Sequence, residues 1–161
     1  MVEMKVEGLT LDPLTNMPII ILKDSTGQKA LPIWVGIFEA NAIALEIESI
    51  TTPRPMTHDL LKNVVLSMQG EIKHILVNEL KDNTFHAMIA VNYNGNILNI
   101  DSRPSDALAL AVRFESPVFV EDAVIDENGI EFEKEDFGDE AIVDEFKEFL
   151  DQVNPEDFQG G

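Results

Sequence analysis

The chain has 161 residues, of which 45% are hydrophobic, and it contains no cysteine. This length supports one ordinary domain with a hydrophobic core, and the lack of cysteine excludes disulfides, zinc–cysteine sites and thiol catalysis. The net charge of −19 argues at first against nucleic-acid binding, but residues 121–161 hold 16 of the 30 acidic residues, whereas residues 1–120 hold 14 acidic and 9 basic residues.

The first 35 residues predict three strands. Residues 2–12 alternate in polarity, and the turn DPLTN separates them from an apolar run over residues 17–24, which indicates a hairpin. The turn DSTGQK then leads to a third run over residues 29–35. These apolar runs are too short to span a bilayer, and the amino terminus lacks a signal-peptide core. We therefore expect a soluble cytoplasmic protein with no membrane partner.

Two helices should follow, separated by the proline-rich loop ITTPRP. Gly36 ends the third run, and residues 37–49 have helical length, with Phe38 on the same face as two later apolar residues. Trp34 and Phe38 could stack on a nucleic-acid base, but their apolar neighbours favour a place in the core. Thr57 is predicted to cap a second helix that ends at Gly70. The apolar residues that should form one face of this helix are Leu60, Leu61, Val64, Val65 and Met68.

Residues 71–102 predict an antiparallel meander. Asn94-Gly95 between apolar runs is a strong hairpin signal, because both turn residues need positive φ. It sets Val91 opposite Leu98 and Ile89 opposite Ile100. Asp82-Asn83 is expected to close the preceding hairpin, with Phe85 opposite Leu80 and His86 opposite Glu79, a cross-strand pair that explains His86 without function. His74 is interpreted as structural.

The last part of the chain predicts a helix from about residue 104 to Glu115, a short strand over residues 117–122 and an acidic helix over residues 138–153. Strands and helices come in blocks, which favours an α+β fold with a mainly antiparallel or mixed sheet packed with buried helices. We expect one domain over residues 1–125 and an acidic helical appendage over residues 126–161.

A charged motif opens the helix near residue 104, and it has a partial echo earlier in the chain. RPSDALAL at 103–110 and RPMTHDLL at 54–61 both place Arg-Pro before a hydroxyl residue, an aspartate and an apolar helix. Helix-start preferences explain the proline, the hydroxyl residue and the aspartate. They do not explain Arg103, because a cation is unfavourable at a helix amino terminus. Either a carboxylate such as Asp101 pairs with it, or an anionic ligand binds there.

Four segments in order resemble the bifunctional nuclease domain family, formerly a domain of unknown function. They are LPIWVGIFEANAIAL at 31–45, RPMTHDLL at 54–61, LKDNTFHAMI at 80–89 and IDSRPSDALALAVR at 100–113. The resemblance covers roughly residues 3–125. Plant members of that family are described as cutting both DNA and RNA. The resemblance therefore implies a nuclease that hydrolyses phosphodiester bonds of DNA or RNA.

The polar residues inside these segments are the candidates that the resemblance brings forward. The candidate catalytic residues are Asp101, Arg103, Asp106, His58 and Asp59, the candidate substrate-binding residues are Arg54, Thr57, Ser105 and Lys81, and the candidate metal ligands are Asp101, Asp106 and Glu39. Such carboxylates would suit Mg²⁺ or Mn²⁺ in metal-assisted hydrolysis. For Glu39, an exposed position or an ion pair with an arginine is the favoured interpretation. His58 is a candidate general base because imidazole titrates near neutral pH.

A different class of function fits the same residues. In this alternative the protein is a non-catalytic oligomeric scaffold or binding module, and the charged corners are ion pairs that brace buried helices. The alanine-rich segments ALALAV and ANAIAL provide small helix faces that pack closely. We therefore expect a homo-oligomer, with a dimer as the default because dimers are the most frequent assembly.

Overall fold

The apolar runs of the amino-terminal third all form strands. The computed structural model describes residues 1–131. Strands β1 (Val2–Leu11), β2 (Pro18–Asp24) and β3 (Lys29–Trp34) pair antiparallel in series. The predicted hairpin and third strand are therefore confirmed, and each of these strands buries apolar side chains in the core.

The predicted meander is also confirmed, with its register. It consists of β4 (Glu71–Lys81), β5 (Thr84–Tyr93) and β6 (Asn96–Ser102), which pair antiparallel. Val91 pairs with Leu98, and His86 pairs with Glu79, as expected. The turn residues Asp82, Asn83, Asn94 and Gly95 all have positive φ, which is the backbone conformation that two-residue hairpin turns require.

One short strand joins these two groups into a single sheet. β7 (Val118–Val120) pairs antiparallel with β1 and parallel with β4, and β8 (Ile130–Glu131) pairs with β3. Within residues 1–131 the strand order is β6-β5-β4-β7-β1-β2-β3-β8, so β6 and β8 are the edges of this part of the sheet. The fold is therefore α+β with an eight-stranded mixed sheet, as predicted.

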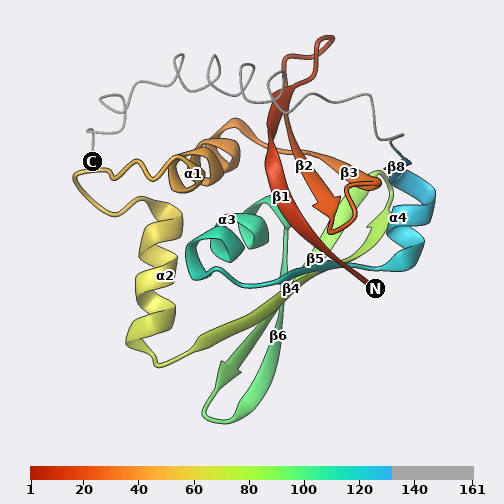
Figure 1. The fold of residues 1–161 in the computed structure, drawn as a ribbon. Coiled ribbons are helices and arrows are strands. Elements are labelled where there is room, and N and C mark those ends of the chain that lie inside the picture. The colour runs from red at the N-terminus through yellow and green to blue at the C-terminus, as the bar shows by residue number, and fades with distance from the viewer. Residues whose placement is uncertain (132–161) are drawn as a thin grey trace.

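Three of the four helices of residues 1–131 pack together. Helix α3 (Pro104–Phe114) packs against α1 (Ile37–Ile47), α2 (Thr57–Ser67), β4 and β5, and α4 (Asp122–Asn128) lies apart beside β3 (Figure 1). Residues 107–111 of α3 are all buried. A central helix that is buried on most sides fixes its own amino-terminal turn against its neighbours, and this turn carries the charged motif.

The predicted start of α2 is wrong. Met56, not Thr57, is the N-cap residue, and Thr57 is the first helical residue. The backbone amide of Met56 instead donates to Oδ2 of Asp59 at 3.0 Å, so the aspartate three residues further on satisfies an amide at this helix start. The helix also ends at Ser67, and Gln69 rather than Gly70 adopts the left-handed conformation, with φ of 61°.

The apolar face of α2 is largely open to solvent, contrary to what its periodicity suggests. Only Val65 of this face packs partly against the core. Leu60 and Met68 are 56% and 57% exposed, and Leu61 and Val64 are also exposed. A helix can show an apolar stripe that its own chain does not cover, because periodicity does not tell which partner buries it.

The expectation that Trp34 and Phe38 belong to the core is wrong as well. Trp34 ends β3 with 53% of its surface exposed, and Phe38 is 80% exposed in the first turn of α1. Both residues lie at the end of an element, Trp34 at the end of β3 and Phe38 at the start of α1. Their apolar neighbours in the sequence therefore did not show that they would be buried. The exposed aromatic side chains lie next to the charged corner described below.

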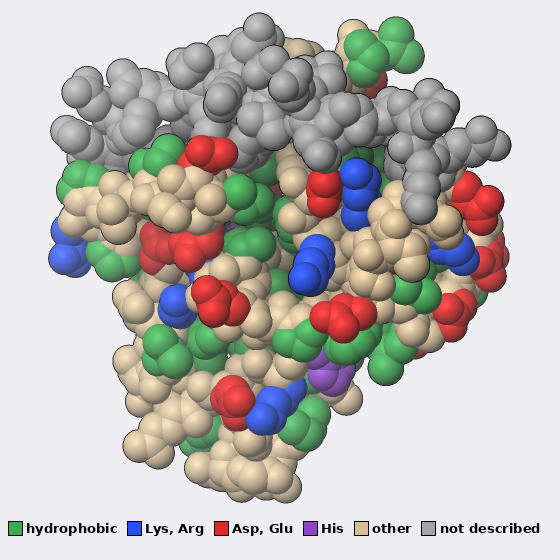
Figure 2. Space-filling view, viewed as in Figure 1, with side chains coloured by type: hydrophobic (Ala, Val, Ile, Leu, Met, Phe, Trp, Pro, Cys, Tyr) green, Lys and Arg blue, Asp and Glu red, His purple; other side chains and the backbone are tan. Residues whose placement is uncertain are grey.

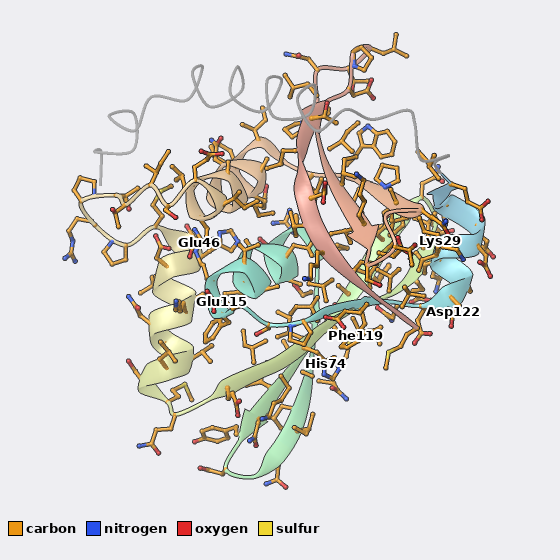
Figure 3. The ribbon with its side chains drawn as sticks, viewed as in Figure 1. Lys29, Glu46, His74, Glu115, Phe119 and Asp122 are labelled. Carbon is orange, nitrogen blue, oxygen red and sulfur yellow. The ribbon has the colours of Figure 1, made fainter. Side chains whose placement is uncertain are left out.

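The remaining predictions concern the carboxyl-terminal part. His74 on β4 packs edge-to-face against Phe119 on β7, with ring centroids 5.8 Å apart (Figure 3), which fits its structural interpretation. The strand expected over residues 117–122 is limited to β7, and α4 was not predicted. The acidic helix expected over residues 138–153 lies outside the described residues. The domain boundary at residue 125 stays a prediction. In residues 1–131, no helix is long and apolar enough to cross a membrane.

Candidate functional site

Arg103 directly precedes α3, and two carboxylates hold it there. Its Nη2 lies 2.6 Å from Oε1 of Glu39 on α1, and its Nε donates to Oδ2 of Asp106 at 2.9 Å. These partners raise the pKa of Arg103, the Glu39 hydrogen bond most strongly. The cation is therefore stable at the unfavourable end of the helix dipole. Its partner is not Asp101, as suggested above, but the pair of Glu39 and Asp106.

Glu39 reaches Arg103 because the backbone at Gly36 leaves room for its side chain. A Cβ atom at Gly36 would clash with Oε2 of Glu39. Gly36 is the N-cap residue of α1, with ordinary backbone angles, so space rather than conformational freedom explains the glycine here. The Glu39 side chain is only 14% exposed. The ion pair of Glu39 with an arginine, one of the interpretations given above, is present.

His58 extends the network behind Asp106. Its Nε2 lies 2.9 Å from Oδ1 of Asp106, and His58 is 8% exposed. The two Arg-Pro motifs therefore meet through the first turns of α2 and α3. The resulting chain of contacts runs from Glu39 through Arg103 and Asp106 to His58, and we call these four residues the Arg103 network.

A second ion pair braces the same two helices one residue further along α2. Nε of Arg113 donates to Oδ1 of Asp59 at 2.8 Å, and Nη1 of Arg113 donates to the carbonyl of Ala109. The Arg113 side chain is 3% exposed. Burial raises the pKa of Asp59, but the hydrogen bonds from Arg113 and from the Met56 amide outweigh it and hold this pKa below its usual value. Asp59 therefore stays ionised as the counterion of a buried arginine.

The other candidates lie around the Arg103 network without joining it. Asp101 on β6, Lys81 at the end of β4 and Thr57 are exposed, and no hydrogen bond or ion pair within residues 1–131 links them to the network. Arg54 is exposed too, and it lines a different pocket together with Asp59. Ser105, by contrast, is 7% exposed in the first turn of α3.

A pocket of about 370 Å³ opens beside Arg103. It lies between the end of β3, the turn that joins β4 to β5, and the start of α3. Trp34, Phe85, Arg103 and Ser105 are among its lining residues. Among residues 1–131, no side chain caps α3, and Pro104 at its first position has no amide hydrogen. The pocket therefore combines an exposed guanidinium, a free helix amino terminus and aromatic surface, which together can accept an anion with an attached ring.

Comparison with known proteins fits this architecture. The family model of the bifunctional nuclease domain matches residues 20–133. The chain belongs to the bifunctional nuclease domain family. The matched region contains the whole Arg103 network, from Glu39 to Asp106.

Individual relatives fall into two groups. An uncharacterized protein of Mycobacterium tuberculosis is 36% identical over 163 residues, which cover 98% of each chain. Bifunctional nuclease 1 of Arabidopsis thaliana is 29% identical over 71% of this chain, and bifunctional nuclease 2 of Oryza sativa subsp. japonica is 25% identical over 77%. The chain spans 36% and 39% of the lengths of these two plant proteins. The chain thus matches the bacterial relative over almost its whole length, but it matches only a part of each plant protein.

The carboxylates of this family member do not form a ready metal cage. Within residues 1–131, no group of three or more His, Asp or Glu residues is placed to hold a metal ion. Glu39 and Asp106 are oxygen donors of the type that Mg²⁺ and Mn²⁺ prefer, but both bond to Arg103. A cation could meet them only together with another source of oxygen ligands, such as a substrate phosphate.

Two contributors to the site were missed from the sequence. Arg113 was not among the candidate residues, although an arginine ten residues after Arg103 on a buried helix must find a buried partner. Gly36 was taken only as the end of a strand. Its position three residues before Glu39 was the signal, since a glycine there can admit the carboxylate.

The face of the molecule drawn in Figure 2 carries mixed charges: acidic and basic side chains are interspersed there, with no continuous basic stripe. A protein that grips a long duplex needs many lysines and arginines along the path of the phosphates. The bifunctional nuclease domain of this chain offers isolated cations instead, of which Arg103 is fixed and 66% exposed in its side chain.

Proposed function

We propose that this protein is a nuclease that hydrolyses phosphodiester bonds of DNA or RNA at the Arg103 network. The observation that carries the proposal is the exposed guanidinium of Arg103, which two carboxylates fix beside a pocket at an uncapped helix start. Membership of the bifunctional nuclease domain family supports it. The plant relatives named above bear the name bifunctional nuclease, and we extend that activity to this chain.

Arg103 is the residue that would receive the phosphate. Its Nε and Nη2 are occupied by Asp106 and Glu39, whereas no residue among 1–131 accepts a hydrogen bond from Nη1. The Arg103 side chain is 66% exposed, so a phosphate oxygen can accept hydrogen bonds from Nη1. A fixed cation costs little reorganisation when negative charge develops on the phosphoryl oxygens, and this favours hydrolysis.

Asp106 and His58 would manage the proton. In hydrolysis a water oxygen attacks phosphorus, the bond to the leaving oxygen breaks, and a proton passes from the water to that oxygen. Of these two side chains, the Asp106 carboxylate is the more accessible to water: it is 30% exposed, whereas the His58 imidazole is 10% exposed. We therefore assign proton transfer to Asp106, and to His58 the positioning of Asp106 through its hydrogen bond, rather than the role of free general base.

The charge balance of the network favours a cation requirement. Arg103 faces both Glu39 and Asp106, so these three residues together carry one net negative charge. A bare phosphate would be repelled by that excess. Mg²⁺ is commonly held by one or two carboxylates together with substrate phosphates, so Glu39 or Asp106 would share it with the substrate, and it would offset the phosphate charge. We propose Mg²⁺ or Mn²⁺ on this ground, with Asp101 as a further carboxylate on the adjacent strand.

The other candidate residues would contact the substrate at the edges of the site. We propose the cytoplasm as the location of the protein. Lys81 precedes the turn that contains Asn83, and Asn83 and the first residue of β5, Thr84, line the Arg103 pocket. Lys81 would therefore contact a flanking phosphate. Thr57 and Arg54 would lie on the α2 side of the substrate. Because these cations are few and separate, a short or single-stranded stretch of nucleic acid suits this surface better than a long duplex.

A second candidate function has its own observation. The open apolar face of α2 and the exposed Ile97, Leu98 and Ile100 of β6 are typical of a surface that another chain covers. In this alternative the protein is an oligomeric scaffold, and the Arg103 network only braces α1, α2 and α3. An oligomer is compatible with both the nuclease and the scaffold. A measurement of nuclease activity therefore decides between the two functions.

The test is cleavage of single-stranded DNA, duplex DNA and RNA by the purified protein with Mg²⁺, Mn²⁺ or a chelator. The proposal predicts cleavage of single strands or RNA with a divalent cation, and less cleavage of duplex DNA. If no substrate is cut under any of these conditions, the scaffold function replaces the nuclease proposal.

A further inference from the structure

Trp34 is an exposed aromatic side chain that the protein holds in place. Its indole Nε1 donates to Oδ2 of Asp12 at 3.0 Å, and this hydrogen bond is the main cause that lowers the pKa of the Asp12 carboxyl. The residue nevertheless keeps 53% of its surface open to solvent. An exposed tryptophan normally costs solvation free energy, so a fixed and open indole indicates a contact surface rather than a core residue.

The same indole lines the pocket that contains Arg103. Phe85 adds a second aromatic ring to the lining, and the turn residues Asn83 and Thr84 add polar groups. The pocket volume of about 370 Å³ is within the range of about 300–1,000 Å³ that is typical of small-molecule sites. Aromatic surface and a cation in the same pocket match the base and the phosphate of a nucleotide.

Ser105 supplies a further polar group at the cationic end. It is 93% buried, since 7% of its surface is exposed, and it lines the pocket. No residue in the described range 1–131 forms a hydrogen bond with its hydroxyl group. With the uncapped amides of α3, this hydroxyl can donate to a phosphate that Arg103 attracts.

We infer that this pocket binds one unstacked nucleotide of a single-stranded nucleic acid, with its base against Trp34 and its phosphate at Arg103. The inference rests on the proposed nuclease function and names the substrate class of that site. A base inside a duplex is stacked on both sides and cannot reach an indole, whereas bases of single strands stack readily on aromatic side chains. Phe38, 80% exposed and next to Glu39, offers a ring for a neighbouring base.

Trp34 is also the single tryptophan of the chain, so its fluorescence reports on this pocket alone. The first measurement is quenching of Trp34 emission by a phosphorothioate-linked oligothymidylate, which resists cleavage, compared with a phosphorothioate duplex of the same length. Both titrations are run with Mg²⁺. We expect saturable quenching by the single strand, and at least about tenfold weaker binding of the duplex.

Substitutions then test which residue contacts the base and which contacts the phosphate. Binding of each variant is measured by fluorescence anisotropy of a labelled oligothymidylate. Trp34→Ala should weaken binding by about fivefold to a hundredfold, the effect of losing one base–aromatic stack, whereas Trp34→Phe should keep most of it. Arg103→Ala should weaken binding and flatten its dependence on salt. Lys5→Ala, which removes an exposed cation of β1, is the matched control and should leave binding unchanged.

The outcomes separate this inference from the proposed function. Unchanged Trp34 emission from a protein that still cleaves nucleic acid would overturn the nucleotide pocket and leave the nuclease intact. Equal quenching by the duplex would overturn the assignment to single strands. Quenching with the predicted effects of the variants, from a protein that cuts nothing, would support the pocket and contradict the nuclease.

Discussion

Nε2 of His58 lies 2.9 Å from Oδ1 of Asp106, although 48 positions separate the two residues in the chain. This contact joins the starts of α2 and α3, and it brings both Arg-Pro motifs to one corner. The carboxylate of Asp106 is thereby held from two sides, by His58 and by Arg103. A carboxylate fixed in this way keeps its orientation beside Arg103, which is the condition for the proposed proton transfer.

Removal of the His58 contact should reduce catalysis without abolishing it. In His58→Ala, Asp106 keeps its bond to Arg103 but loses its second anchor. We expect kcat to fall by about tenfold to a hundredfold with little change in KM, since substrate contacts remain. Asp106→Asn should lower kcat more strongly, because the amide cannot take a proton. Steady-state kinetics across pH measures both, and a His58→Ala enzyme with an unaltered kcat would remove His58 from the site.

The substitution Gly36→Ala tests whether the Glu39 side chain needs the space beside Gly36 to reach Arg103. The new Cβ would meet Oε2 of Glu39, the end of a flexible side chain, so the carboxylate can move away at small cost. We expect stability to change by no more than about 1 kcal/mol, as is usual for an N-cap substitution. Cleavage should fall, because Arg103 loses its partner on α1.

The control for that variant is Glu39→Gln, which keeps the size of the side chain and removes its charge. Similar losses of cleavage in both variants would agree with a role of the Glu39–Arg103 ion pair. Full activity of both variants would show that Arg103 needs only Asp106.

Asp59→Asn should destabilise the fold. The substitution leaves the guanidinium of Arg113 buried without its carboxylate partner. We expect a loss of about 2 kcal/mol at neutral pH, less than for a fully buried pair because Asp59 is partly exposed. Urea unfolding of the two proteins measures this difference.

The pH dependence of this effect follows from the direction of the Asp59 shift. The pKa of Asp59 is lower in the folded protein than its ordinary value near 4. Its contribution to the free energy of unfolding is therefore complete above about pH 4 and is lost as the pH falls through the lowered pKa. Wild type and Asp59→Asn should differ at pH 7 and converge in acid. A difference that persists unchanged below that pKa would contradict the role of this ion pair.

The edge strand β6 makes the assembly state testable. All its residues except Ser102 are exposed, and the only charge among them is Asp101. An unpaired edge with apolar side chains and no lysine or proline favours pairing with another chain. We expect a homodimer, and Leu98→Lys together with Ile100→Lys should convert it to the monomer. Sedimentation equilibrium decides this, and a monomeric wild type would remove the prediction.

Local signals predicted the sheet well because hairpin turns encode their own register. Asn94-Gly95 and Asp82-Asn83 supply the positive φ angles of two adjacent turns, so the pairing of β4, β5 and β6 followed from a few residues. The charged corner was harder to predict. The motifs identified His58 and Asp106 as candidates, but their contact depends on how α2 and α3 pack, which no local pattern contains.

Burial was the least predictable property. Trp34 was expected in the core but is exposed, and the apolar face of α2, for which no burial was predicted, is largely exposed as well. Apolar character shows that a residue gains from burial, but not whether its own chain, a substrate or a second copy supplies the partner. These two exposed surfaces are therefore the ones for which we propose a function.

Cleavage by an Arg103→Ala variant beside wild type and Lys5→Ala tests the central claim most directly. All three proteins are prepared identically, their thermal unfolding is compared, and each is assayed on single-stranded DNA and RNA with Mg²⁺ or Mn²⁺ and with chelator. Our account predicts that Arg103→Ala lowers kcat/KM by about a hundredfold to a thousandfold while it stays folded, and that Lys5→Ala matches wild type. Equal cleavage by all three proteins would contradict the assignment of the active site to the Arg103 network.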